Sequence, residues 1–231
     1  WNTLFTPSDS TIVFATVKES KASMTGDFGK GFSSYLGVRH IQITPEGGAN
    51  SEIHTDPSFE TMVMLMYQKN LKFIGGQYNR VGLGQRKPRY TLTITKGWEG
   101  VLGSIYDYER YTVAASWITR HGPLGRFEWN VDVGTYTGEA PYTLMELHPS
   151  NTAYISVPTS FNVIRNMEFV SESWVKAMVE WHGEGLFFNR VPLLKRLGLR
   201  EVLGAKAVKG FWDGSDPSAN THGLNDIYGE M

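Results

Sequence analysis

The chain has 231 residues, a formal net charge of −1 at pH 7, no cysteine and an aromatic share of 13%. This length suits one sizeable domain or a single barrel sheet, and the balanced charge provides no basic field for nucleic acid. Without cysteine, a disulfide scaffold, a thiolate metal site and a cysteine nucleophile are excluded. No stretch of about 18 apolar residues occurs, which excludes a membrane helix but not a membrane barrel, because barrel strands only alternate in polarity.

The two ends of the chain indicate a piece of a longer protein. It begins at Trp1 without an initiator Met or a signal peptide, and it ends at Met231 within a polar stretch. We therefore expect a domain that is incomplete at both ends. No linker and no repeat longer than a hairpin divides the sequence, so we treat residues 1–231 as one domain.

The first third of the chain predicts three strands, at Thr11–Lys18, Phe32–Thr44 and Phe59–Gln68. The apolar positions of the second strand change parity near Arg39, which predicts a bulge. The third segment is apolar on both faces, and its neighbours favour a strand over a helix. The polar, glycine-containing segments 20–31 and 45–57 predict loops.

A hairpin in the middle of the chain carries the strongest strand pattern. After a long polar loop at 69–88 and a strand at Tyr90–Lys96, Tyr111–Trp117 and Phe127–Val133 are joined by a short turn at 121–125. Each arm has an apolar file that ends in aromatic residues and an opposite polar file. In a membrane barrel the first file contacts lipid and the second lines the lumen. This pattern assigns Trp117, Phe127, Trp129, Val131 and Val133 to lipid, and Glu128, Asn130 and Asp132 to the lumen.

The last third predicts two strands joined by a helical turn. Met167–Gly183 alternates in polarity, which places Lys176, Glu180 and His182 on the lumen side. Pro192 then opens a short amphipathic helix near 192–199, with Gly198 near its end, and a further strand follows at Glu201–Phe211. Residues 138–165 are irregular and 213–231 predict a loop with an unfinished element, so about eight strands are expected.

No pattern in the sequence predicts catalysis. His182 with Glu180 and Glu184 could form a proton relay or ligand cluster, but a polar lumen wall is the favoured interpretation. His54 and Asp56 are interpreted as loop residues rather than half of a metal site. Phosphate loops, nucleophile elbows and His-Glu-x-x-His motifs are missing. We expect no catalytic residue, no metal and no cofactor.

Two segments carry a resemblance to a known family. GLFFNRVPLLKRLGLREVLGAKA (185–207) and FNVIRNMEFVSESWV (161–175) resemble the C-terminal barrel of a Bacteroidota outer-membrane family of unknown function that has an N-terminal carboxypeptidase-regulatory-like domain. The similarity extends from about Gly29 to Gly210. It implies an all-β, antiparallel transmembrane β-barrel and a periplasmic domain preceding it. The residues of the family-like motifs, for which we expect structural roles, are Phe161, Asn162, Glu168, Phe169, Phe187, Phe188, Asn189, Pro192, Arg200 and Glu201.

The first functional hypothesis is therefore an integral outer-membrane barrel protein that serves transport, assembly or scaffolding in an outer-membrane complex. Its partners would be outer-membrane lipid and other outer-membrane proteins, without nucleic acid. The alternative is a soluble β-rich glycan-binding module in which the aromatic residues stack on sugars. A third, a barrel enzyme such as an outer-membrane hydrolase, would need a Ser/His/acid cluster in space. Aromatic residues spread in two bands around the barrel would favour the first hypothesis, whereas aromatic residues gathered on one patch would favour the second.

Overall fold

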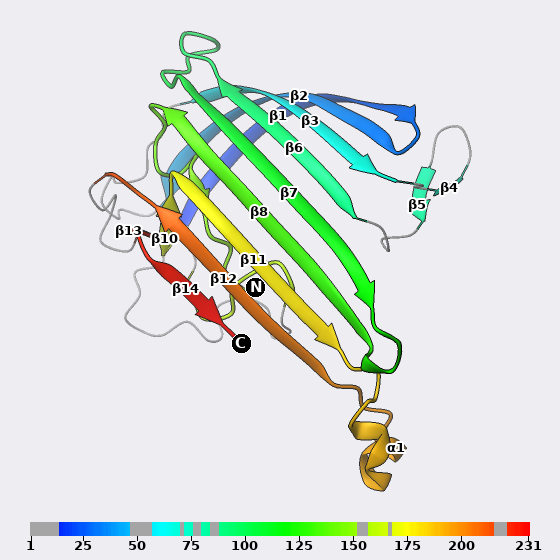
Figure 1. Cartoon of the computed structure of the whole chain (residues 1–231). Coiled ribbons are helices and arrows are strands. Elements are labelled where there is room, and N and C mark those ends of the chain that lie inside the picture. The colour runs from blue at the N-terminus through cyan, green and yellow to red at the C-terminus, as the bar shows by residue number, and fades with distance from the viewer. Residues whose placement is uncertain are drawn as a thin grey trace.

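The chain folds into one large sheet of nine strands with smaller elements against it (Figure 1). A computed structural model describes residues 14–46, 57–69, 72–75, 80–83, 88–151, 157–165, 168–214 and 221–231. All neighbouring strands of the large sheet are antiparallel. In spatial order these strands are β1 (Phe14–Gly29), β2 (Phe32–Glu46), β3 (Ser58–Gln68), β6 (Arg89–Gly97), β7 (Tyr108–Arg120), β8 (Arg126–Gly138), β11 (Ser173–His182), β12 (Val202–Phe211) and β14 (Ile227–Glu230).

The large sheet is strongly curved and open among the described residues. β1 and β14 are its two edges, and no described strand joins them. Figure 1 shows the strands bending around the segment that carries the smaller sheet. The predicted all-β, mostly antiparallel fold is confirmed, while barrel closure stays a prediction.

The remaining elements are short. A second sheet contains β9 (Glu146–Leu147), β10 (Phe169–Ser171) and β13 (His222–Gly223), with β10 parallel to β13. A separate hairpin contains β4 (Lys72–Gly75) and β5 (Arg80–Leu83). The helical elements are η1 (Gly122–Leu124), η2 (Phe188–Arg190) and α1 (Pro192–Leu197).

Strand register divides the large sheet into two faces, because residues paired across neighbouring strands point to the same side. Val113 pairs with Leu92 and Val133, and Val133 pairs with Val175, so these residues share one side. We call this side the apolar face. The opposite side, which contains Arg110, Asp132 and Lys176, is the polar face.

The buried core lies on the polar face, between the sheet and the segments that fold back over it. One cluster contains Phe161, Ile164, Met178, Val208 and Leu224, and the other contains Tyr106, Tyr108, Tyr136 and Trp174. Trp174 fits closely because Gly134 lies beneath it, where a Cβ atom would be 2.2 Å from Trp174 Cζ2. Ala140, Leu144 and Met145 of the covering segment pack against the cluster that contains Trp174.

Two predictions about β1 and β2 are wrong. The predicted loop 20–31 belongs mostly to β1, which pairs with β2 up to Gly29. Its described side chains from Val17 to Thr25 are exposed, so polar residues on both sides cost little while the ladder satisfies the backbone. The predicted bulge near Arg39 is also missing, since the register shifts only between Asp27 and Gly29. The change in parity occurs because Ile41, although apolar, lies on the polar face, where it is buried.

The predicted strand Met167–Gly183 is two strands in two sheets. β10 leaves the large sheet, β11 joins it, and Glu172 lies between them. Alternation continues through this point because both strands are extended, so periodicity does not reveal the change of sheet. Strands β9 and β13, within segments predicted as irregular or loop, and hairpin β4–β5, within the predicted loop 69–88, are further differences, whereas β14 lies where an unfinished element was expected.

Several local predictions are confirmed. Strands β3, β6, β7, β8 and β12 occur where the patterns place them, and the short turn at 121–125 contains η1. α1 begins at Pro192 and ends before Gly198, which adopts the left-handed conformation with φ 65°. Glycine is suited to that position because it lacks the Cβ atom that makes φ > 0 unfavourable. His54 and Asp56 lie outside the described residues.

Candidate functional site

The apolar face runs across the sheet as a continuous belt of aliphatic side chains. Leu65, Leu92, Val113, Val133 and Val175 lie side by side in successive strands. Each is at least 36% exposed, so the face has no cover among the described residues. The central strands β3, β6, β7, β8, β11 and β12 have between 9 and 13 residues. Strands of about 9–11 residues span a bilayer when tilted.

Aromatic residues gather at one end of this belt, next to the turn between β7 and β8. The rings of Trp117 and Trp129 stack with centroids 5.9 Å apart, and Phe127 lies 6.0 Å from Trp129. Trp181 lies beside Phe127 and donates through Nε1 to Leu124 O at 2.6 Å. These indoles therefore combine an apolar ring with a polar contact at the sheet end.

The other end of the belt carries aromatic and charged residues together. Trp98 Nε1 donates to Thr61 Oγ1 at 2.9 Å, and Tyr111 donates to Glu109 Oε2 at 2.5 Å. Lys96 Nζ lies 2.5 Å from Asp107 Oδ1 and stands over the Trp98 ring. The apolar face is therefore bounded at both ends by residues with polar groups.

The polar face contains a buried ion cluster centred on Glu146 of β9. Arg110 of β7 donates to Glu146 Oε2 at 2.5 Å, and Lys176 of β11 contacts Glu146 Oε1. Lys176 also lies 3.2 Å from Asp132 Oδ1, which accepts a 2.5 Å hydrogen bond from Trp174 Nε1. The cluster fastens the small sheet onto the large one, because Glu146 belongs to the small sheet while Arg110 and Lys176 belong to the large one.

A second pair of charged residues holds the loop 157–164. Lys206 of β12 donates from Nζ to the carbonyl oxygens of Val157 and Ser160, at 2.9 and 2.6 Å. Glu230 of β14 accepts hydrogen bonds from the backbone N–H groups of Asn162 and Val163, between 2.8 and 3.2 Å. The loop is thereby bonded to two adjacent strands.

Glu60 is a buried acid at the far side of the polar face. It is 2% exposed and contacts Arg39 and the hydroxyl of Tyr108. Gly97 lies beneath that tyrosine, where a Cβ atom would be 2.5 Å from Tyr108 Cε1. Glu60 therefore has both a cation and a hydroxyl as partners, as a buried carboxylate requires.

The cluster around His182 lies at the end of the polar face near η1. His182 Nε2 is 2.6 Å from Glu180 Oε1 and 3.5 Å from Glu128 Oε1, while Arg126 Nε donates to Glu128 at 3.0 Å. Glu184, which the sequence grouped with His182, instead lies 3.8 Å from Arg126. Within the described ranges, no group of three His, Asp or Glu side chains could hold a metal ion. The arrangement is a network of close contacts between acidic, basic and imidazole side chains that are all partly exposed.

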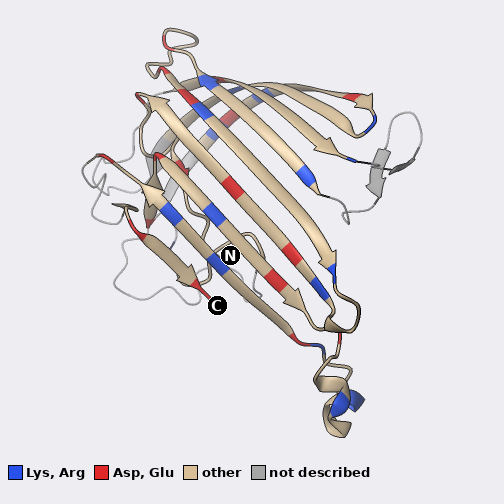
Figure 2. Cartoon of the chain, viewed as in Figure 1, with Lys and Arg blue, Asp and Glu red and all other residues tan. Residues whose placement is uncertain are grey.

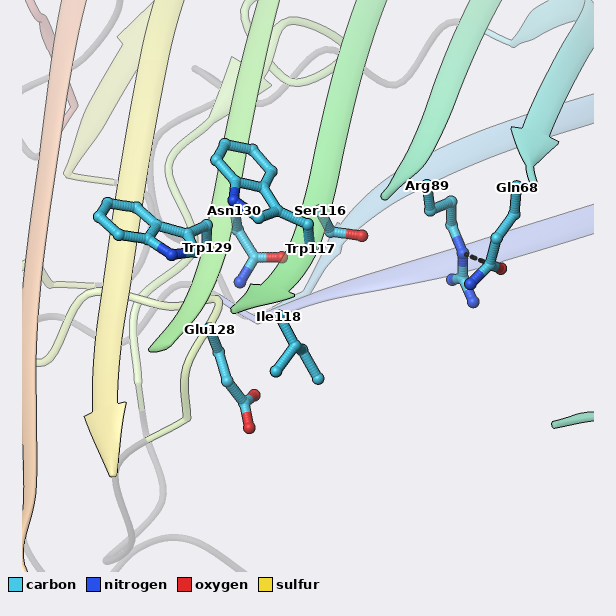
Figure 3. A pocket seen from close by; sticks show the side chains of 8 residues that line it. All are labelled: Gln68, Arg89, Ser116, Trp117, Ile118, Glu128, Trp129 and Asn130. Carbon is cyan, nitrogen blue, oxygen red and sulfur yellow. Dashed lines mark hydrogen bonds between the residues drawn. The ribbon is translucent and has the colours of Figure 1, made fainter. Parts of the chain in front are cut away.

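A hollow of about 180 Å³ opens at the same end of the sheet (Figure 3). Arg89 Nε donates to Gln68 Oε1 at its margin, at 3.4 Å. Ser116, Ile118, Glu128 and Asn130 also line it. Its lining mixes amide, hydroxyl and carboxylate groups without a nucleophile paired to a base.

The structure places the predicted face residues consistently with the register. The residues predicted to face lipid all lie on the apolar face, namely Trp117, Phe127, Trp129, Val131 and Val133. The residues predicted to face the lumen all lie on the polar face, namely Glu128, Asn130, Asp132, Lys176, Glu180 and His182. What each face contacts in the cell stays a prediction.

The family-like motif residues occupy turns and internal packing positions. Phe161 and Phe169 belong to the core on the polar face, Asn162 binds Glu230, and Glu168 Oε2 accepts from Arg165 N at 2.7 Å. Phe187, Phe188, Asn189, Pro192, Arg200 and Glu201 lie in the connection between β11 and β12. Burial opposes ionisation of Glu201, but backbone N–H groups, that of Phe187 foremost, outweigh it and hold its pKa below the ordinary value.

Sequence reasoning missed the residues that join the internal segment to the sheet. Glu146 has no periodic signal, because its strand has two residues. Arg110 and Lys206 lie opposite apolar files and could be assigned to a polar face, but their partners are 36 and 46 to 49 residues away along the chain. Only the folded topology brings these groups together.

These features define an all-β domain with a curved antiparallel sheet, one apolar face and one ion-paired face. The chain belongs to the family of unknown function DUF5686: residues 39–210 match its C-terminal domain. No curated protein matches the chain. In the part of the chain that the structure describes, no helix is long and apolar enough to cross a membrane.

Proposed function

We propose that this chain is the greater part of a transmembrane β-barrel in a bacterial outer membrane, and that it serves transport, assembly or scaffolding rather than catalysis. The apolar face would contact lipid and the polar face would line the lumen. Closure would require further strands or a partner, because an open sheet edge cannot satisfy its backbone groups inside a bilayer. A periplasmic domain preceding the barrel, as in the Bacteroidota family that the sequence resembles, belongs to the same proposal.

The observation that carries this proposal is the uninterrupted apolar face across successive strands of membrane-spanning length. Between its aromatic ends, the face is aliphatic from Leu65 through Leu92 and Val113 to Val133 and Val175. In water this row of exposed aliphatic side chains would form a contiguous apolar patch, and large patches of this kind are uncommon on soluble monomers. The charged groups instead lie on the opposite face, as in barrels whose lumen is polar.

The segment bound to the polar face favours an assembly, scaffolding or gated-transport role over an open diffusion pore. Glu146, Lys206 and Glu230 hold residues of β9 and of the loop 157–164 against the sheet. Water-filled porins leave this space open.

The test is to express the protein with its natural flanking sequence and to separate washed outer membranes from soluble protein. We expect the chain to resist carbonate extraction and to migrate differently on a gel before and after boiling, because a closed barrel stays folded in detergent. Recovery as a soluble monomer without detergent would contradict the proposal.

A soluble glycan-binding module is the second candidate, and the stacked cluster of Trp117, Phe127 and Trp129 is the observation that favours it. Flat aromatic surfaces suit sugar rings as well as membrane boundaries. Trp98 and Tyr111, at the opposite end of the face, favour the membrane instead. Glycan binding by soluble protein, lost in Trp117→Ala, would support this candidate over the barrel.

A further inference from the structure

The connection between β11 and β12 projects beyond the end of the large sheet (Figure 1). It spans residues 183–201, contains η2 and α1, and is called the tip here. Glu201 holds its base together: Gly183 N donates to Glu201 O at 3.0 Å, and Phe187 N donates to Glu201 Oε1 at 2.8 Å. A Cβ atom on Gly183 would lie 2.5 Å from Glu201 Cγ, so glycine permits this close approach.

The tip exposes large apolar side chains next to the apolar face. Leu193 is 70% exposed and Leu197 64%, and their spacing of four residues places them on one side of α1. Phe187 is 56% exposed and packs edge-on against Trp181, with ring centroids 6.2 Å apart. Trp181 belongs to the apolar face, so the exposed apolar surface continues from the sheet into the tip.

The same segment is strongly basic. Arg190, Lys195, Arg196 and Arg200 are all exposed, and none of them forms an ion pair with a described residue. The two acids of the tip are engaged elsewhere, since Glu184 lies near Arg126 and Glu201 accepts from backbone N–H groups. Figure 2 shows Lys and Arg positions of α1 in blue, at the far end of the tip. The tip therefore presents unpaired positive charge beside exposed leucines.

We propose that the tip binds the anionic phospholipid surface of the bilayer, with Leu193 and Leu197 inserted among the acyl chains and the basic side chains at the headgroup phosphates. This inference rests on the proposed membrane location of the sheet. Amphipathic segments with leucines on one side and lysines or arginines on the other bind the interface in this way. Long basic side chains keep their charge at the headgroup level while their stems contact apolar surface. The tip would fix the depth of the β11–β12 hairpin in the membrane.

The absence of cysteine in the chain allows a single probe. The Leu197→Cys protein, labelled with an environment-sensitive dye, is refolded into vesicles of phosphatidylcholine alone or mixed with phosphatidylglycerol. We expect a blue-shifted emission and quenching by spin labels near the top of the acyl chains, both stronger with phosphatidylglycerol. Adding Lys195→Gln and Arg196→Gln is expected to weaken tip insertion about 25-fold, since each basic residue near an anionic surface contributes about fivefold.

Two controls isolate the tip. A label at Arg165→Cys, in the loop on the polar face, should report water in both kinds of vesicle. Replacing two exposed lysines of β1, Lys18→Gln and Lys21→Gln, should leave the Leu197 label unchanged. The first control carries one label, as the test protein does, but at another place. The second control removes two positive charges, as the double substitution in the tip does, but from β1.

The outcomes separate this inference from the proposed function. If the protein enters vesicles with heat-modifiable mobility but the Leu197 label stays in water, the tip inference is wrong and the membrane proposal stands. Burial of the label without any dependence on phosphatidylglycerol or on Lys195 and Arg196 also overturns the anionic recognition. Failure of the protein to enter vesicles overturns both.

Discussion

Glycine residues beneath aromatic rings allow side chains of neighbouring strands to lie flat on the polar face of the large sheet. Trp174 covers Gly134, and Tyr108 covers Gly97. In both places the aromatic ring fills the space that a side chain at the glycine would occupy. Trp174 then donates from Nε1 to Asp132, and the hydroxyl of Tyr108 donates to Glu60. Sequence patterns predicted the strands but not these contacts, because a glycine within a strand can mark a bulge, a bend or the close approach of another group.

Replacing Gly134 by alanine is expected to displace Trp174 from Asp132. The added Cβ atom would lie 2.2 Å from Cζ2 of an indole that is itself buried, so the ring or the strand must move. We expect a loss of about 1–3 kcal/mol in the free energy of unfolding, the usual cost of overpacking. Denaturant unfolding in detergent, followed by tryptophan fluorescence, measures it.

Gly204→Ala is the matched control, because its nearest atom would be Val179 O at 3.9 Å. That variant should unfold within about 0.5 kcal/mol of the parent, as surface changes usually do. Equal stability of the Gly134 and Gly204 variants would show that Trp174 does not depend on Gly134.

His148, next to β9, predicts a pH dependence. It is 1% exposed, and its Nε2 lies 2.8 Å from Ser171 Oγ. Burial lowers its pKa to about 4, and the nearby charge of Lys176 acts in the same direction. The unfolded chain binds a proton near pH 6.5 while the folded chain stays neutral. Its contribution to stability is therefore complete above about pH 6.5 and is lost as the pH falls to about 4.

Unfolding free energies measured between pH 7 and pH 4 for the parent and for His148→Gln test this expectation. The parent should lose up to about 3 kcal/mol more than the variant over this interval. Parallel pH profiles would show that His148 is not neutral and buried in the folded protein.

At the scale of single elements, the alternation of each strand predicted which residues share a face. Because side chains in a strand alternate with a period of two, the face of one residue fixes the face of all the others. A shift by one residue would move every side chain to the other side. The faces of β8 and β11 were therefore predictable from their own sequences. The turn chemistry of Pro192 and Gly198 likewise predicted α1.

The apolar face gives a depth-dependent prediction. Val113→Arg places a charge in the middle of the belt, beside Leu92 and Val133, whereas Thr137→Arg places it at the end of β8. In a bilayer we expect Val113→Arg to cost about 2–4 kcal/mol and Thr137→Arg about 1 kcal/mol or less. Refolding equilibria in lipid vesicles measure both.

A soluble sheet would behave differently, since Val113 is 55% exposed and water would hydrate the new charge. Similar and small effects of both substitutions would therefore argue that the apolar face does not contact lipid. The comparison needs both variants, because any single charge substitution also changes β propensity.

At the scale of the whole molecule, a few long-range ion pairs join the internal segment to the sheet. Glu146 is the clearest, since Arg110 of β7 and Lys176 of β11 both contact its carboxylate. Removing one partner of a buried ion pair leaves the others without compensation. The position of the internal segment should therefore depend on this acid.

Glu146→Gln is expected to destabilise the protein by about 2–4 kcal/mol, near the low end for broken buried pairs because Arg110 is partly exposed. It should also expose the segment between β8 and β11 to proteases. Limited proteolysis measures the exposure of the segment, and the temperature of heating at which the folded gel band disappears measures the loss of stability. Glu139→Gln, an exposed acid at the end of β8, should change neither.

The sequence by itself determined the class of the fold, the two faces of the central strands, the turn at 121–125 and a helix near 192–199, which the structure places at Pro192–Leu197. These features depend on alternation, helical spacing, proline and glycine, which act between residues close together in the chain. Only the tertiary structure decided that β10 leaves the large sheet, that residues 20–29 extend β1, and that Glu146 and Glu230 hold the segments on the polar face. The contacts of Glu146 and Glu230 join residues far apart in the chain, so no local pattern encodes them. The extension of β1 is held by backbone pairing with β2, which needs no alternation of side chains.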